Sequence, residues 1–148
     1  MGAGADVTAC IYLPTVMSPM TFNFTPHKDA CMDHGGIPAS VVVKDAGITS
    51  VSVGYVESKV SGFKCLSAPS YWTLAYNVDG SSYSGSVRTQ WMCPPENNSI
   101  TLDNPGTTTV NTAPARSTVT HQEWHGRGSL FIIFSPATAD LLAATDST

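Results

Sequence analysis

The chain has 148 residues, a formal net charge of −4 and only 12% charged residues. Its seven basic residues are scattered without a cluster, which argues against binding to the phosphate backbone of a nucleic acid. No apolar run approaches the roughly 18 residues of a membrane-spanning helix, so we expect no membrane span. This length corresponds to one ordinary domain, and residues 1–148 are predicted to form a single β domain.

The composition favours strands over helices and an exported protein over a cytosolic one. Ser and Thr together number 34, whereas the chain has only 7 Leu, 4 Lys and 3 Glu. Good helix formers are scarce, while residues that suit a pleated surface are common. Residues 1–5 have neither the basic nor the apolar region of a signal peptide. The low charge is typical of secreted or cell-surface proteins and of proteins on the outside of a virion.

Short runs of alternating apolar and polar residues predict strands in the first half of the chain. These strands are expected over residues 7–13, 20–25, 41–43, 48–60 and 63–66. We expect Pro26 to end the second strand and residues 27–38 to form a polar loop. The run at 41–43 is predicted to be buried on both faces. In the long fourth strand Val51, Val53 and Tyr55 fall on one face. Gly54 indicates a bulge or a close approach of the backbone, and Val56 and Val60 indicate a change of face.

Residues 71–93 are predicted to form a central hairpin with a tight turn at Asp79-Gly80. In its first arm the apolar side chains share one face, and they are Trp72, Leu74, Tyr76 and Val78. In its second arm one face carries Tyr83, Gly85, Val87, Thr89, Trp91 and Cys93. Two of the three tryptophans lie in this hairpin, so it carries enough apolar surface to begin a core.

The rest of the chain is read as short strands and one short helix. Strands are predicted over residues 99–102, 117–124 and 130–134. Residues 107–120 are predicted to be either an edge strand with a break or an exposed, extended loop. Ser135-Pro136 has the pattern of a helix start, with the helix continuing over 137–144.

These elements predict an all-β fold: an antiparallel β-sandwich or a partly closed barrel with a short C-terminal helix. The order of the strands does not follow from the sequence. The residues predicted to form the core are Ile11, Phe22, Phe24, Val51, Val53, Trp72, Leu74, Tyr76, Val87, Trp91, Phe131 and Ile133.

The four cysteines are Cys10, Cys31, Cys65 and Cys93. An even number of cysteines in a chain of this composition predicts two disulfides, for which three connectivities are possible. We favour pairing Cys10 with Cys31 and Cys65 with Cys93. The alternative is a reduced protein with four buried thiols.

Two segments carry residue types that bind metals. The first is His27, Cys31 and His34, in which imidazole and thiolate are good zinc ligands. The second is His121, Glu123 and His125, which would form a row on one face of a strand. Neither has the spacing of an established metal motif, so a polar loop and a solvated strand face are the alternatives. We expect no cofactor.

The absence of a nucleophile elbow or phosphate loop favours a protein that is not an enzyme. The expected function is that of an extracellular or virion-surface β domain acting by binding or assembly, such as an attachment, adhesion or coat-type module. A small metal-binding protein or metal-dependent enzyme is the alternative, and a secreted inhibitor or toxin-like domain is a third possibility. The expected partner is a protein or glycan receptor, or identical subunits. The candidate binding residues are Tyr12, Tyr71, Tyr83 and Trp124.

The apolar run Leu130–Phe134 places large side chains on both faces of one strand. A sheet with one face in water cannot cover all of them, so the following helix or a neighbouring subunit is needed. A helix this short is marginal on its own. We therefore predict a homo-oligomer with this strand or the helix after it in the interface.

Overall fold

A computed structural model describes residues 4–66, 68–79, 84–91, 98–102, 108–113, 117–119, 121–124 and 127–136. After residue 91, the side chains described are those of Ile132 and Phe134. The described residues form twelve strands. They are β1 (Gly4–Leu13), β2 (Met20–Ala30), β3 (Met32–Gly35), β4 (Ala39–Val43), β5 (Gly47–Ser58), β6 (Ser70–Val78), β7 (Ser84–Trp91), β8 (Asn98–Leu102), β9 (Thr108–Ala113), β10 (Ser117–Val119), β11 (His121–Trp124) and β12 (Arg127–Pro136).

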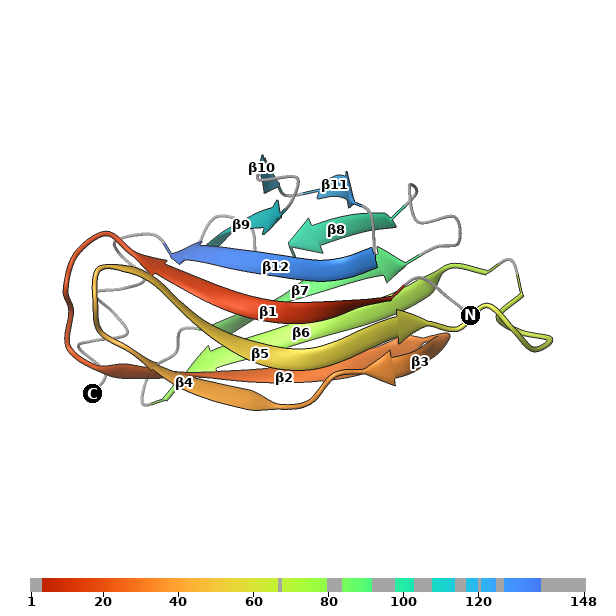
Figure 1. The fold of residues 1–148 in the computed structure, drawn as a ribbon, viewed down its shortest axis with the longest axis horizontal. Coiled ribbons are helices and arrows are strands. Elements are labelled where there is room, and N and C mark those ends of the chain that lie inside the picture. The colour runs from red at the N-terminus through yellow and green to blue at the C-terminus, as the bar shows by residue number, and fades with distance from the viewer. Residues whose placement is uncertain are drawn as a thin grey trace.

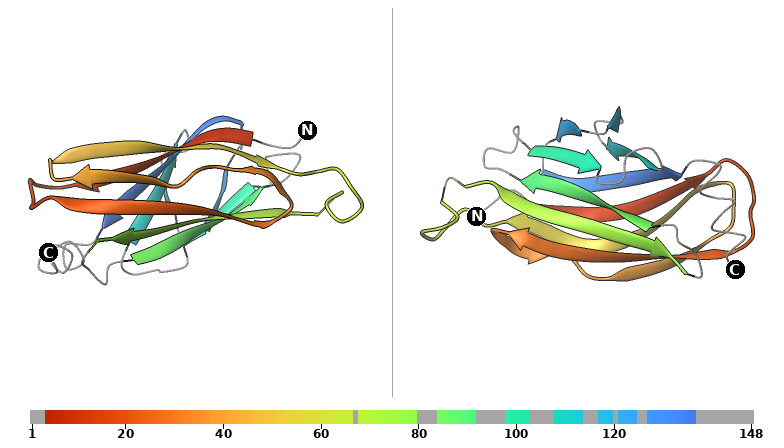
Figure 2. Two further views of the ribbon diagram at one scale, coloured as in Figure 1. Left: turned by 90° about the horizontal axis from the view of Figure 1, so that it is seen from below. Right: turned by 180° about the vertical axis from the view of Figure 1, so that it is seen from behind.

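The strands form two six-stranded sheets, which pack face to face as a β-sandwich (Figures 1 and 2). Sheet A has the order β10-β9-β12-β1-β5-β3, and sheet B has the order β11-β8-β7-β6-β2-β4. Among the described strands, the paired neighbours are antiparallel except for β1 and β12, which run parallel in the middle of sheet A. The all-β prediction is confirmed, whereas this parallel pair was not predicted.

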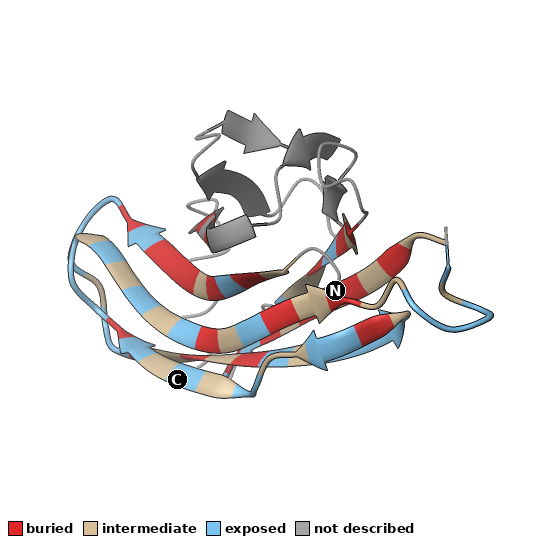
Figure 3. Ribbon diagram, turned by 45° about the vertical axis from the view of Figure 1, so that its right-hand side comes forward, coloured by how far each residue is buried: buried red, intermediate tan, exposed pale blue. Residues whose placement is uncertain are grey.

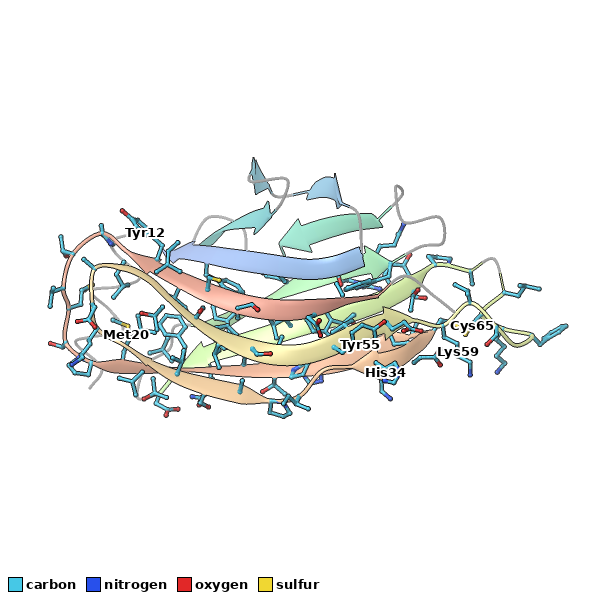
Figure 4. All side chains as sticks on the ribbon, viewed as in Figure 1. Tyr12, Met20, His34, Tyr55, Lys59 and Cys65 are labelled. Carbon is cyan, nitrogen blue, oxygen red and sulfur yellow. A yellow bond between two sulfur atoms is a disulfide. The ribbon has the colours of Figure 1, made fainter. Side chains whose placement is uncertain are left out.

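The first six strands alternate between the two sheets, so each connection among them crosses the sandwich. The crossings from β2 to β3 and from β5 to β6 lie at one end, which also carries the disulfide between Cys31 and Cys65 (Figures 1 and 4). We call this end the disulfide end. The connections from β1 to β2 and from β4 to β5 lie at the opposite end (Figure 1).

One core fills the space between the sheets, and buried residues alternate with exposed ones along the strands (Figure 3). Its largest fully buried side chains are Trp72, Trp91, Phe22, Phe24, Phe134, Ile11, Leu13, Leu74 and Ile132. Phe134 of sheet A joins the two layers, because its ring lies 5.6 Å from that of Phe24 and 4.9 Å from that of Tyr76, both in sheet B. Aromatic pairs at these separations add to the free energy of burial.

Most of the predicted core is confirmed. Ten of the twelve predicted residues are buried or, in the case of Val51, packed against the buried cluster. The exceptions lie on β12, where Ile132 and Phe134 are the buried side chains. The side chains of Phe131 and Ile133 are outside the described part of the chain.

Several predicted strands are confirmed: 7–13 as β1, the two arms of the central hairpin as β6 and β7, and 99–102 within β8. Residues 107–120 contain two strands that pair antiparallel with each other, so the extended strand structure is confirmed; β10 is the edge strand of sheet A, whereas β9 lies between β10 and β12. The bulge at Gly54 is also confirmed, since the register between β1 and β5 shifts there and Gly54 has φ +87°. After the bulge, Val56 points inward and Tyr55 is exposed.

The prediction that Pro26 ends a strand was wrong, as was the loop over 27–38. Pro26 lies within β2 and pairs with Leu74, and part of the expected loop forms β3. The reason is that β4 pairs only with residues 20–24 of β2. Beyond them β2 has β6 on one side only, and a proline is tolerated at such an edge.

Two short strands were also predicted wrongly. Residues 63–66 form turns rather than a strand. In β4 the side chain of Val42 is 55% exposed, so residues 41–43 are not buried on both faces. Sheet B packs on sheet A through one face only, so Val42 on the outer face of β4 is in contact with solvent.

The remaining differences concern the hairpin turn, the strand predicted over 117–124 and the predicted C-terminal helix. A two-residue turn at Asp79-Gly80 would pair Asn77 with Ser82, but the observed partner is Ser84, so the tight turn was wrong. The strand predicted over 117–124 is divided into β10 of sheet A and β11 of sheet B. Ser135 and Pro136 belong to β12 rather than to a helix start, and the helix predicted over 137–144 lies outside the described residues.

Candidate functional site

The predicted binding aromatics do not form one site. Tyr12 lies on the outer face of sheet A near the end opposite the disulfide (Figure 4). Tyr71 lies on the outer face of sheet B, where the guanidinium carbon of Arg88 is 4.4 Å from the centre of its ring. Because the two outer faces point in opposite directions, Tyr12 and Tyr71 cannot contact one small ligand together. Tyr83 and the side chain of Trp124 lie outside the described part of the chain.

The favoured disulfide pairing was wrong. Cys31 is bonded to Cys65, with their Cα atoms 5.6 Å apart, and Cys10 is a buried free thiol. Cys10 lies inside sheet A, between Ser50 of β5 and Ile133 of β12, whereas Cys31 lies at the disulfide end. Burial raises the pKa of the Cys10 thiol, because the charged thiolate is poorly solvated there. Cys93 is outside the described residues.

The first metal-ligand segment loses its thiolate, because the sulfur of Cys31 is in the disulfide. Its two histidines lie in different sheets, His27 on β2 and His34 on β3, and both are exposed. Within the described ranges, no three His, Cys, Asp or Glu side chains are grouped as metal ligands. The second segment stays a prediction, since His121 and Glu123 are described only in their backbone and His125 is not described.

The disulfide end contains an open cavity of about 430 Å³ at the edge of the sandwich. It is lined by Pro26 and Lys28 of β2, by residues 33–37 of β3 and the turn after it, and by Tyr55 of β5. The volume lies within the range of small-molecule sites. The chain around it crosses between the sheets twice, at Cys31 and again after Gly35, so side chains from both sheets meet here.

Tyr55, which lines this cavity, is 43% exposed. Its ring centre lies 5.4 Å from that of His34, with the two planes at 58° (Figure 4). The Tyr55 hydroxyl donates a hydrogen bond to Oε2 of Glu57 at 2.5 Å. It also lies over Gly4, where any Cβ atom would collide with it. These contacts hold the aromatic ring in one orientation while leaving part of it accessible.

The Glu57 carboxylate also changes the acidity of Tyr55. The hydrogen bond to Glu57 raises the pKa of Tyr55, because it is donated by the neutral phenol. Desolvation and the negative charges of Glu57 and Asp6 act in the same direction. Tyr55 is therefore a neutral, hydrogen-bonded phenol at physiological pH.

The wall of the cavity is fixed by backbone contacts at the Gly54 bulge. Gly36 donates to the carbonyl of Tyr55 at 3.1 Å, and Ile37 donates to that of Val53 at 2.7 Å. Gly36 has φ +79°, and a Cβ atom there would collide with the Val53 carbonyl oxygen. The buried indole of Trp72 donates to the carbonyl of Gly35 at 2.8 Å. The core of the sandwich thus sets the position of the cavity wall.

Charged side chains complete the lining. The stem of Lys28 lies over Gly35, which has no side chain to displace it. Asp33 and His34 are exposed on β3, which follows β2 in the chain after Cys31. The cavity therefore combines one cation, one carboxylate, an imidazole and an aromatic ring. Such a set supplies hydrogen-bond donors and acceptors around a flat apolar surface.

Few features of the sequence indicate this site. Tyr55 was assigned to the inner face because the change of face was placed at Val56 rather than at Gly54. His34 was considered only as a metal ligand. The one usable signal was Gly35-Gly36, a pair that indicates close approach of the backbone.

This chain matches no family model, and neither a curated protein nor a solved structure is significantly similar to it. Function is therefore inferred from the site and not from a relative.

Two further observations bear on location. The disulfide is compatible with an extracellular protein, because such bonds persist in oxidising compartments. Among the described residues, we find no helix with the length and apolar character needed to cross a membrane.

Proposed function

We propose that the chain is a non-enzymatic extracellular or virion-surface β domain that acts in attachment or adhesion, and that the cavity at the disulfide end binds a glycan receptor. The observation that carries this proposal is the partly exposed ring of Tyr55, held in place by Glu57 and His34 beside an open cavity. A rigid aromatic side chain loses little conformational entropy when it binds, and such residues dominate recognition surfaces.

The chemistry of the lining favours a sugar over an apolar ligand. One face of a pyranose ring presents C–H groups, which pack on the electron-rich face of an aromatic ring. Its hydroxyl groups both donate and accept hydrogen bonds, and Lys28, Asp33 and His34 supply the complementary groups around Tyr55. A protein receptor with a polar side chain in the cavity is the alternative partner.

Binding of the purified chain to an array of neutral and acidic glycans tests this proposal. We expect Tyr55→Ala to abolish the signal and Tyr12→Ala to preserve it. Tyr12 is the matched control, because both tyrosines are 43% exposed and they lie in different parts of sheet A. A melting curve for each variant confirms that it is folded. Unchanged glycan binding by Tyr55→Ala, or no binding by the parent chain, would refute the glycan proposal.

A second candidate function is assembly with identical subunits, and a specific feature of β4 favours it. β4 is the end strand of sheet B, contains no charged residue and exposes Val42. Uncharged, apolar edge strands pair readily with other chains. β12 cannot pair with another chain in this way, because its two edges are already paired with β1 and β9. The interface predicted for Leu130–Phe134 would therefore have to use the outer face of β12, and it stays a prediction.

Light scattering across a hundredfold dilution tests assembly. We expect an oligomer that becomes monomeric with Val42→Lys but not with Ile48→Lys, since Ile48 is similarly exposed but lies on β5, inside sheet A. A monomer at every concentration would exclude the coat-type function.

A further inference from the structure

The segment between β5 and β6 projects beyond the rest of the sandwich at the disulfide end (Figures 1 and 2). We call residues 59–66 the tip. At the tip Phe63 is fully exposed and Leu66 is 69% exposed. Two large apolar side chains in water at the outermost point of a domain are unusual, because burying them elsewhere would stabilise the protein.

The tip is held in position by its own contacts. The disulfide joins Cys65 to Cys31, and the amide of Lys59 donates to the carbonyl of Cys31 at 2.7 Å. Within the tip, the amide of Leu66 donates to the carbonyl of Gly62 at 3.1 Å. Gly62 has φ +87°, a conformation that favours glycine. Phe63 and Leu66 are therefore presented by a fixed turn.

The charge at the tip is opposite to that of the whole chain. The net charge of the protein is −4, yet the tip carries Lys59 and Lys64, and no acidic residue occurs between Glu57 and Asp79. Lys64 is exposed and Lys59 is half-buried. The carboxylate of Asp29, which lies on β2 two residues before Cys31 and outside the tip, accepts a hydrogen bond from the Thr73 hydroxyl. Within the tip, basic side chains therefore flank the exposed apolar ones.

We propose that the tip docks on an anionic lipid surface, with Phe63 and Leu66 entering the interfacial region and the two lysines at the level of the headgroups. Apolar side chains beside lysines are the combination found in segments that lie at membrane interfaces. Lysine is depleted at protein–protein interfaces, and one turn of this size covers far less than the roughly 800 Å² that a stable partner buries on each side. Both observations favour lipid over a protein partner.

This inference does not depend on the ligand of the Tyr55 cavity. The tip lies after β5 and the cavity lies between β2, β3 and β5, so each can be altered separately. A domain with both features would bind a receptor glycan while contacting the membrane that carries it.

Flotation with vesicles of phosphatidylcholine, with and without phosphatidylserine, tests the proposal. We expect the chain to float with the phosphatidylserine vesicles and to be released by salt, because the lysine contribution is electrostatic. Phe63→Ser should weaken vesicle binding by about tenfold or more, from the loss of one buried aromatic side chain. Lys64→Gln should weaken it by about fivefold.

Matched controls lie at the opposite end of the sandwich. Val16→Ser removes an apolar side chain that is 72% exposed, and Lys44→Gln removes a lysine from the connection before β5. Neither should change vesicle binding. Since Phe63 is fully exposed, its replacement should leave the melting temperature unchanged, so lost binding cannot be attributed to unfolding.

The outcomes separate this proposal from the previous one. Phe63→Ser should lose vesicle binding and keep glycan binding, whereas Tyr55→Ala should do the reverse. Absence of vesicle binding by the parent chain, equal binding by Phe63→Ser, or equal loss with Val16→Ser would each overturn the lipid proposal. Glycan binding that persists in any of these cases would leave the cavity proposal standing.

Discussion

The buried indoles of Trp72 and Trp91 meet edge to face, with their ring centres 6.4 Å apart and their planes at 88°. They are also joined through one side chain. The indole N–H of Trp91 donates to the Thr89 hydroxyl at 2.6 Å, and that hydroxyl donates to the Trp72 carbonyl at 2.9 Å. All three residues are fully buried. Because Trp72 also holds Gly35 at the cavity wall, this group connects the core to the candidate site.

Removing the Thr89 hydroxyl should destabilise the protein. Thr89→Val retains the shape of the side chain but leaves the Trp91 indole without this acceptor, at a cost of about 1 to 3 kcal/mol. The control is Thr25→Val on β2 of the same sheet, where the side chain is exposed and the cost should be below about 0.5 kcal/mol. Denaturant unfolding measures both. Equal costs for the two variants would contradict the role of the buried hydrogen bond.

Replacing either buried tryptophan should cost more than replacing an exposed aromatic residue. Trp72→Ala and Trp91→Ala should each lower the free energy of unfolding by about 3 to 5 kcal/mol, because each leaves a cavity in the core. Phe63→Ala should leave it within about 0.5 kcal/mol. Thermal melts compare the three variants. Near-normal stability of Trp72→Ala would show that its ring is not part of the core.

Non-reducing peptide mapping should recover a peptide that joins Cys31 to Cys65. The free Cys10 thiol should resist alkylation until the protein is unfolded, since burial raises its pKa and restricts access. Removing the disulfide with Cys31→Ser and Cys65→Ser should cost about 3 to 4 kcal/mol, as estimated for a closed loop of this length. A peptide joining Cys10 to Cys31 would contradict this pairing.

The central hairpin and the faces of most strands were predictable, because alternation along β1, β6 and β7 reports directly which residues are buried. The order of strands was not predictable, since six successive strands alternate between sheets and leave no local signal for their partners. The pairing of the cysteines was predicted wrongly for the same reason. Cys31 and Cys65 are 34 residues apart and are joined only because two crossings meet at one end.

The candidate site was harder to predict than the core. Tyr55 faces outward because the bulge changes the alternation of inward and outward side chains at Gly54 and not at Val56. The end of β2 was predicted wrongly at Pro26. A proline is tolerated inside this strand only because β4 stops pairing with β2 before that position. In both cases a tertiary contact decides the position of a lining residue, and a single sequence contains no record of that contact.

Alanine substitutions at two glycines should separate backbone strain from steric collision. Gly47→Ala, at φ +96° with open space around it, should cost about 1 kcal/mol. Gly36→Ala combines φ +79° with a collision against the Val53 carbonyl, so it should cost clearly more and displace the cavity wall. Urea denaturation gives the two values. Equal losses of unfolding free energy in the two variants would show that the backbone around Gly36 can accommodate a Cβ atom without a steric penalty.

Tyr55 should ionise at a higher pH than an ordinary tyrosine, because its hydroxyl donates to Glu57. Its raised pKa means that the folded protein holds the phenolic proton more tightly than the unfolded chain does. This stabilising contribution is fully present below the unfolded-state pKa of about 10 and is lost as the pH rises through the higher folded-state value. In Glu57→Gln the carboxylate acceptor and its charge are removed, so Tyr55 should ionise at lower pH than in the parent chain.

Phenolate absorbance during an alkaline titration measures this, and subtracting the curve of Tyr55→Phe isolates the contribution of Tyr55. The control is Asp45→Asn, which removes an exposed carboxylate at the opposite end of the sandwich and should leave the Tyr55 curve unchanged. An identical Tyr55 curve in the parent chain and in Glu57→Gln would mean that Glu57 does not hold the hydroxyl. The fixed orientation on which the glycan proposal depends would then lose its physical cause, because exposure alone leaves the ring free to turn away from the cavity.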